Sequence, residues 1–122
     1  WAFLPEHRFF VRGGLRDGSV LFGNTRESHV LAGAHSATVS AIAISQECTR
    51  FIHDSNGLLL LTGALDGSVA FWMAEDSRWH NFTRLVKWQS HLAGIRCLDF
   101  SDHMGLALSC GDDGLINVYR LR

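Results

Sequence analysis

The stretch LTGALDGSVAFW, residues 61–72, decides the fold of this chain because a second copy of it follows. The first copy holds one charged residue, Asp66, in a Gly-rich turn between two apolar runs. The second copy, LSCGDDGLINVY, spans residues 108–119, so Asp66 corresponds to Asp113 at an offset of 47 residues (113 − 66). The same offset pairs Thr62 with Ser109, Gly67 with Gly114, Phe71 with Val118 and Trp72 with Tyr119. A single active site would not need the same acid twice, so the repeat favours a structural role for both acids.

The repeat extends upstream of each copy. His35 begins HSATVSAIAIS and His91 begins HLAGIRCLDFS, with apolar and Ser positions in common. A weaker third copy, GGLRDGSVLF, covers residues 13–22 and contains Asp17. A repeat of about 40–50 residues with turn signals at fixed places indicates an array of similar structural units.

The sequence of each repeat unit predicts short strands separated by turns. Asp66-Gly67 is a hairpin signal because both residues tolerate positive φ. Residues 40–45, SAIAIS, have apolar or small side chains on both faces, which predicts a buried innermost strand. No segment has a convincing helical period, so the fold class is all-β. The predicted strands are 8–13, 19–22 and 28–31 in the first unit, 38–45, 58–63, 68–73 and 84–89 in the second, and 94–101, 106–110 and 115–121 in the third.

The bulk composition excludes several classes of protein. The chain has 122 residues, is 47% hydrophobic and carries a formal charge of −1, which is typical of a packed domain and gives nucleic acid no basic surface to bind. Apolar runs such as Leu58–Leu61 are far too short to insert in a membrane. The first residue is Trp1, which indicates a piece of a longer protein. Cys48, Cys97 and Cys110 have no disulfide-framework spacing and predict reduced thiols in a cytoplasmic protein.

Four strands per unit, with a His near the start and Asp-Gly followed by Trp near the end, resemble the WD40 β-propeller repeat. The resemblance implies a hydrogen-bonded structural network in which Asp66 accepts from its own turn and from His35, while Thr62 and Trp72 complete the chain. The residues that carry the resemblance are His35, Thr62, Asp66 and Trp72, then His91, Ser109, Asp113 and Tyr119.

The chain departs from the family pattern in three places. Tyr119 replaces the second Trp, and the first unit has Gly23 and Gly13 at the Trp and Thr/Ser positions. The segment 46–56 is longer than the usual turn and predicts a projecting loop. We therefore expect a degenerate partial blade over 1–32, a WD40 repeat over 33–90 and a repeat without its outer strand over 91–122. Because a ring needs about four to eight blades, we expect other blades of the same parent chain to complete it.

A narrower resemblance lies in FLPEHRFFVRGGLRDGSV, residues 3–20. This phrase is similar to the C-terminal propeller of BEACH-domain proteins. It implies a large parent protein that acts in vesicle traffic or in scaffolding at membranes, with this chain peripheral to the membrane.

The sequence contains no catalytic or cofactor motif. None of the seven histidines lies in an H-x-x-x-H pattern, and C-x-x-C, G-x-S-x-G and nucleotide-binding glycine motifs do not occur. We therefore predict a non-enzyme without metal or cofactor.

The leading functional prediction is a scaffold that binds other proteins or peptides. The alternatives are a propeller that reads a short or modified peptide motif, and an enzyme-associated propeller that uses loop residues such as His53 and Asp54. Trp79 lies in a polar segment and is a candidate binding anchor, since Trp is enriched at binding hot spots. By the family resemblance, the remaining partner-binding candidates are Arg16, Ser36, Thr38, Leu65, Leu92, Gly94 and Asp112.

Overall fold

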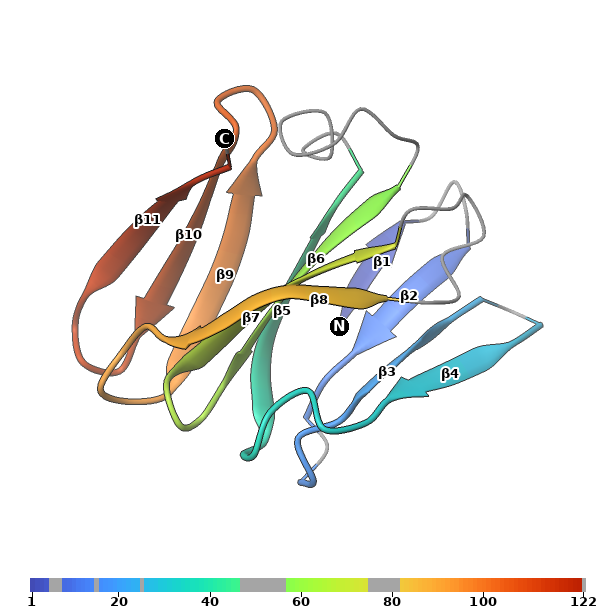
Figure 1. Ribbon diagram of the computed structural model, residues 1–122, viewed down its shortest axis with the longest axis horizontal. Helices are drawn as coiled ribbons and strands as arrows, with labels where there is room; N and C mark the ends of the chain where they lie inside the picture. The colour runs from blue at the N-terminus through green and yellow to red at the C-terminus, as the bar shows by residue number, and fades with distance from the viewer. Residues whose placement is uncertain (5–7, 15, 25, 47–56, 75–81, 122) are drawn as a thin grey trace.

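The computed structural model consists of three antiparallel sheets that lie side by side (Figure 1). The structure describes residues 1–4, 8–14, 16–24, 26–46, 57–74 and 82–121. The predicted anchor Trp79 and nearly all of the predicted 46–56 loop lie outside these residues. The strands are β1 (Ala2–Leu4), β2 (Phe9–Arg12), β3 (Val20–Gly23), β4 (Ser28–Leu31), β5 (Val39–Ser45), β6 (Leu58–Ala64), β7 (Ser68–Ala74), β8 (Thr83–Gln89), β9 (Ile95–Ser101), β10 (Leu106–Gly111) and β11 (Ile116–Arg120).

The first sheet has one strand more than the sequence predicted. Its order is β1-β2-β3-β4, and β1 pairs with β2 through Phe3 opposite Phe10. Only three residues form β1, so it has too little sequence for a recognisable alternating pattern. The other sheets have the orders β5-β6-β7-β8 and β11-β10-β9.

The deepest burial lies in the middle of the central sheet, and the innermost strand over SAIAIS, which we expected to be buried on both faces, is only partly buried. Leu58–Leu61 on β6 are 0% exposed because alternate leucines enter two different cores. Leu58 and Leu60 pack towards the first sheet, and Leu59 and Leu61 towards the third. In β5, by contrast, Ser40 is exposed and Ile42 is half-buried. The reason is that β5 is an edge strand with one neighbour, so the solvent reaches its free side.

The Asp66-Gly67 hairpin has a three-residue connection. The Gly67 N–H donates to Ala64 O at 3.0 Å, and only Gly67 has a positive φ, +85°. Asp66, although its residue type tolerates positive φ, does not adopt it here. Asp66 instead places its carboxylate over the start of β7, in the manner of a turn followed by a left-handed glycine.

The connections that carry the repeated residues lie together on one edge of the three sheets. We call this edge the turn edge; it comprises the β2–β3, β6–β7 and β10–β11 turns and the β4–β5 and β8–β9 connections, seen along the lower side of Figure 1. The edge strands β1 and β9 both contact β5, so the inner edges of the sheets adjoin one another.

Candidate functional site

Four of the predicted network residues of the central sheet lie within one chain of contacts beside the turn edge. The Trp72 Nε1–H donates to Thr62 Oγ1 at 3.0 Å, and Thr62 Oγ1 lies 2.7 Å from His35 Nε2. Thr62, His35 and Trp72 are 0%, 2% and 5% exposed. The β6 and β7 ladder sets this geometry, since it holds Thr62 and Trp72 on the face that the β4–β5 connection covers.

The contacts fix which group donates and which accepts in each hydrogen bond of this series. Ser68 Oγ donates to Asp66 Oδ1 at 2.6 Å, so it accepts from His35 Nδ1–H, 2.7 Å away. His35 Nε2 then accepts the Thr62 hydroxyl hydrogen, and the Thr62 oxygen accepts from Trp72. Each buried polar group has a partner of the required kind, which is the condition under which a buried network stabilises a fold.

The predicted bond between His35 and Asp66 is wrong in one respect, because Ser68 stands between the two residues. Asp66 Oδ1 accepts from both the amide and the hydroxyl of Ser68, and Asp66 Oδ2 accepts from the Ser36 hydroxyl at 3.2 Å. In the third sheet Leu115 occupies the position of Ser68 and has no hydroxyl. His91 Nδ1 therefore contacts Asp113 directly, at 2.9 Å.

Tyr119 takes a place in the third sheet like that of Trp72 in the second. Its hydroxyl lies 2.6 Å from Ser109 Oγ, and Ser109 Oγ lies 2.7 Å from His91 Nε2. Ser90 also bonds the Tyr119 hydroxyl. The Tyr119 hydroxyl thus contacts Ser109 in the same way that the Trp72 N–H contacts Thr62 in the central sheet.

The two network histidines also connect neighbouring sheets through their backbones. The His35 N–H donates to Gly18 O of the first sheet, and the His91 N–H donates to Gly67 O of the second, both at 3.1 Å. Each histidine therefore holds the turn of one sheet with its backbone and the hydroxyl of the next sheet with its ring. The first sheet supplies Asp17, whose Oδ1 accepts from the Ser19 amide and hydroxyl.

The pKa shifts follow from these contacts. Burial, together with the positive charge of Lys87, lowers the pKa of His35 to about 4, although Asp66 opposes the shift. For Asp66 and Asp113, burial raises the pKa, but hydrogen bonds from Ser68 and His91 respectively leave both pKa values below the usual range. Hydrogen bonds from Ser19 likewise lower the pKa of Asp17.

We predict that the protein loses stability in mild acid through His35. Above about pH 6.5 the ring is neutral in both the folded and unfolded states. Below that pH the unfolded chain binds a proton that the folded state excludes until about pH 4. The free energy of unfolding should fall by up to about 1.4 kcal/mol per pH unit in this window. Urea unfolding at several pH values measures the slope.

The control is His35→Gln, whose amide keeps polar groups in the network but cannot titrate. Between pH 6.5 and 4 its free energy of unfolding should fall less steeply with pH than that of the wild-type chain. The difference in slope should approach the value for one bound proton, about 1.4 kcal/mol per pH unit. Equal slopes in the two chains would contradict a neutral buried His35.

The partner-binding candidates differ in how far the structure exposes them. Leu92 is 93% exposed and Leu65 is 55% exposed, both on the turn edge. Thr38 is half-buried, and its carbonyl accepts from the Leu65 N–H at 2.9 Å. Gly94 is buried, and a Cβ there would lie 3.1 Å from Leu65 O. The glycine therefore lets the β6–β7 and β8–β9 connections pack closely and is not exposed to a partner. The remaining described candidates, Arg16, Ser36 and Asp112, are exposed.

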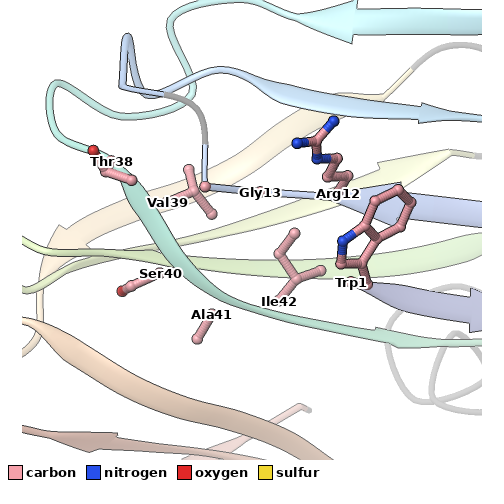
Figure 2. A pocket seen from close by; sticks show the side chains of 9 residues that line it. Trp1, Arg12, Gly13, Thr38, Val39, Ser40, Ala41 and Ile42 are labelled. Atoms are coloured by element: carbon pink, nitrogen blue, oxygen red, sulfur yellow. The ribbon is translucent and has the colours of Figure 1, made fainter.

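A groove opens beside the inner strand of the central sheet, with a volume of about 420 Å³. Figure 2 shows Trp1 and Arg12 on one side of it, and β5 with the preceding Thr38 along the other. The Arg12 guanidinium lies 5.2 Å from the centre of the Trp1 ring, within the range of a cation–π contact. Among the described residues, Arg12 has no carboxylate partner.

Sequence reasoning missed Ser68 and Arg96. Ser68 follows the repeated Asp-Gly, and a Ser follows Asp17-Gly18 as well, so this recurrence was the available signal. Arg96 forms an ion pair with Asp112 on the turn edge. No signal in the sequence places Arg96 there, because Arg96 is the unpaired residue of a bulge in the β9–β10 pairing, which interrupts the strand's regular alternation.

The described residues hold no group of three or more His, Cys, Asp or Glu side chains arranged to bind a metal ion. In the same part of the chain there is no helix that could span a bilayer.

Comparisons with known proteins match this architecture. The family model described as WD domain, G-beta repeat matches residues 26–73 and 82–120. No curated protein matches the chain. A chain in a solved structure titled "Crystal Structure of Mitotic Checkpoint Complex" is similar, with a TM-score of 0.70 and 21% identity. The similarity covers 94% of this chain but 32% of that one, so the present chain spans about a third of the length of its structural neighbour.

Proposed function

Since the chain belongs to the WD40 repeat family, we propose that it is a non-catalytic scaffold that binds a protein partner on the turn edge. The observation that carries this proposal is the pair of exposed leucines, Leu65 and Leu92, on connections that backbone bonds hold in place. The Leu65 N–H donates to Thr38 O at 2.9 Å, and the Asp112 N–H donates to Gly94 O at 2.8 Å. A preorganised apolar surface reduces the entropy that binding costs.

The polar groups around these leucines favour a protein partner over a lipid surface or nucleic acid. Ser36 and Asp112 are exposed on the same turn edge as the leucines, and Arg96 pairs with Asp112, so this edge also carries hydroxyl, carboxylate and guanidinium groups. An apolar centre with a polar rim is typical of protein–protein interfaces. The formal charge of −1 gives no attraction to phosphates.

The two repeated acids, Asp66 and Asp113, both make structural hydrogen bonds. Asp66 and Asp113 accept hydrogen bonds from their own turns and from Ser68 or His91. This occupancy supports a scaffold over an enzymatic propeller. His53 and Asp54 lie outside the described residues.

We predict that Leu92→Asp weakens partner binding at least about tenfold, because it places a charge at the centre of an apolar contact. A photo-crosslinking amino acid at position 92 of the full-length protein first identifies the partner, and titration of the purified partner then gives the dissociation constants. Position 104 is the matched control: Met104 is 66% exposed but lies on the opposite edge, in the β9–β10 connection. Crosslinks of equal yield from positions 92 and 104, or unchanged affinity for Leu92→Asp, would contradict the proposal.

Further blades of the parent chain are the second class of partner that we propose. Ile116 and Val118 on β11 correspond, at the offset of 47 residues, to Val69 and Phe71 on β7. Val69 and Phe71 are buried under the third sheet, whereas Ile116 and Val118 are 68% and 61% exposed. The repeat thus supports a covering sheet on this face of β9–β11.

Gly114 provides the test for a following sheet. A Cβ at Gly18 or at Gly67 would overlap the carbonyl oxygen of the next network histidine, whereas a Cβ at Gly114 meets nothing within 4 Å. If a further sheet follows in the full-length protein, Gly114→Ala should reduce stability as much as Gly67→Ala does. A loss of only about 1 kcal/mol, the cost of a left-handed alanine, would show that no such sheet is present.

A second candidate function, recognition of a short acidic peptide, is supported by the groove beside Arg12 and Trp1. Its test compares the affinities of an acidic peptide and its amidated counterpart for the wild-type protein and for Arg12→Gln. Equal affinities of both peptides for the wild-type protein and for Arg12→Gln would exclude recognition of an acidic peptide at this groove.

The finer proposal of a BEACH-domain parent, cytoplasmic and acting in vesicle traffic at membranes, is supported by the phrase in residues 3–20 alone. The full-length sequence tests it, since a BEACH domain would precede this chain.

A further inference from the structure

Cys97 and Cys110 lie directly opposite each other on neighbouring strands. The β9–β10 register pairs their Cα atoms, and both cysteines are free thiols. Residues opposite each other in an antiparallel pair have Cα atoms about 4.5 or 5.5 Å apart and side chains on one face. A disulfide requires a Cα separation of about 4.4–6.8 Å, so the ladder already holds the two cysteines within bonding range.

In this chain reagents in solution can reach the pair, which lies opposite Ile116 on the face that a following sheet is proposed to cover. Cys97 is exposed and Cys110 is partly exposed. β9 is the edge strand of its sheet, so the backbone on the far side of Cys97 has no neighbouring strand in that sheet. The β9–β10 register shifts directly beside the pair, because Arg96 is an extra, unpaired residue of β9 there.

The central sheet has no room for such a pair at the corresponding positions. The corresponding residues there are Ala41 and Gly63, which are also opposite each other. A Cβ at Gly63 would lie 2.6 Å from Ile95 Cγ2, because the next sheet packs against this point. Two thiols would not fit beneath Ile95. Any sheet that covers Cys97 and Cys110 must therefore leave more room there than the third sheet leaves over Ala41 and Gly63.

From this juxtaposition we propose that Cys97 and Cys110 are a modification site: they form a reversible disulfide between β9 and β10 by exchange with a small disulfide such as oxidised glutathione. The Cys97 thiolate attacks one glutathione sulfur and releases the other glutathione as a thiolate. The Cys110 thiolate then attacks Cys97 Sγ and releases the second glutathione. The two protein protons pass to the released thiolates, so one disulfide is reduced as one is formed.

The test uses the full-length protein in buffers of defined glutathione ratio. After free thiols are alkylated, trypsin cleaves at Arg96 and at Arg120 and releases one peptide, residues 97–120, that contains both cysteines. The oxidised peptide should carry no alkyl group and should lack two hydrogen atoms relative to the dithiol. Cyanogen bromide cleavage at Met104, between the cysteines, should leave two fragments joined only by the disulfide.

The folded ladder should favour the disulfide over the same chain unfolded in urea. We expect the ratio of oxidised to reduced peptide to be at least about tenfold higher in the folded protein, because the sheet raises the effective concentration of the second thiol. Cys97→Ser and Cys110→Ser should each give only a glutathione adduct on the remaining cysteine. A folded wild-type protein that yields the dialkylated peptide or glutathione adducts, or equal ratios in the folded and unfolded chains, would overturn the proposal.

Discussion

Trp72→Ala should be the most destabilising single substitution in the central sheet, lowering the free energy of unfolding by about 3–5 kcal/mol. Trp72 is 5% exposed, and its ring packs in the core between the first and second sheets. The substitution removes this packing and also the N–H that bonds Thr62. Urea unfolding followed by circular dichroism measures the loss.

Trp72→Phe separates the two contributions. Phenylalanine keeps most of the apolar packing but cannot donate to Thr62 Oγ1, so we expect a loss of about 1–2 kcal/mol. A loss as large as that of the alanine variant would mean that packing contributes little. A loss near zero would mean that the bond to Thr62 has no net effect on stability.

Gly67→Ala should reduce stability by about 2–4 kcal/mol through two separate effects. Gly67 has a φ of +85°, which costs an L-residue energy, and its Cα faces the backbone of the β8–β9 connection. A Cβ there would overlap His91 O and would lie 2.8 Å from Ala93 O. The backbone at this point cannot move without breaking the bond from the His91 N–H to Gly67 O.

Gly33→Ala is the matched control for the backbone strain. Gly33 has a φ of +69°, and a Cβ there meets nothing within 4 Å. Its replacement should cost about 1 kcal/mol, from the left-handed conformation alone. If the two variants were equally stable, the close contact between the sheets at Gly67 would be contradicted.

The repeat explains why so much of the fold could be predicted from the sequence. The offset that pairs Asp66 with Asp113 also pairs the turn glycines and the strands around them, so two weak patterns strengthened each other. Each end of the strands in the second and third sheets was predicted to within one residue. The family match agrees with the WD40 architecture. β1 was missed because three residues carry no periodicity.

What the sequence did not predict depends on neighbours that only the assembled sheets supply. Ser68 lies between His35 and Asp66 because the turn brings its hydroxyl under the ring. Gly94 was taken for a surface position, but the packing of two connections buries it. The exposure of β5 depends on its being an edge strand, which no local pattern records.

A double-mutant cycle on Thr62 and Trp72 measures whether the repeated polar residues form a stabilising network. Thr62→Val and Trp72→Phe each remove one partner of the 3.0 Å bond; the first keeps the shape of the side chain, and the second keeps an aromatic ring in the core. If the bond stabilises the fold, the double variant should lose less stability than the sum of the single losses, by about 0.5–2 kcal/mol. Strictly additive losses would mean that Thr62 and Trp72 are independent core residues and that the network does not stabilise the fold.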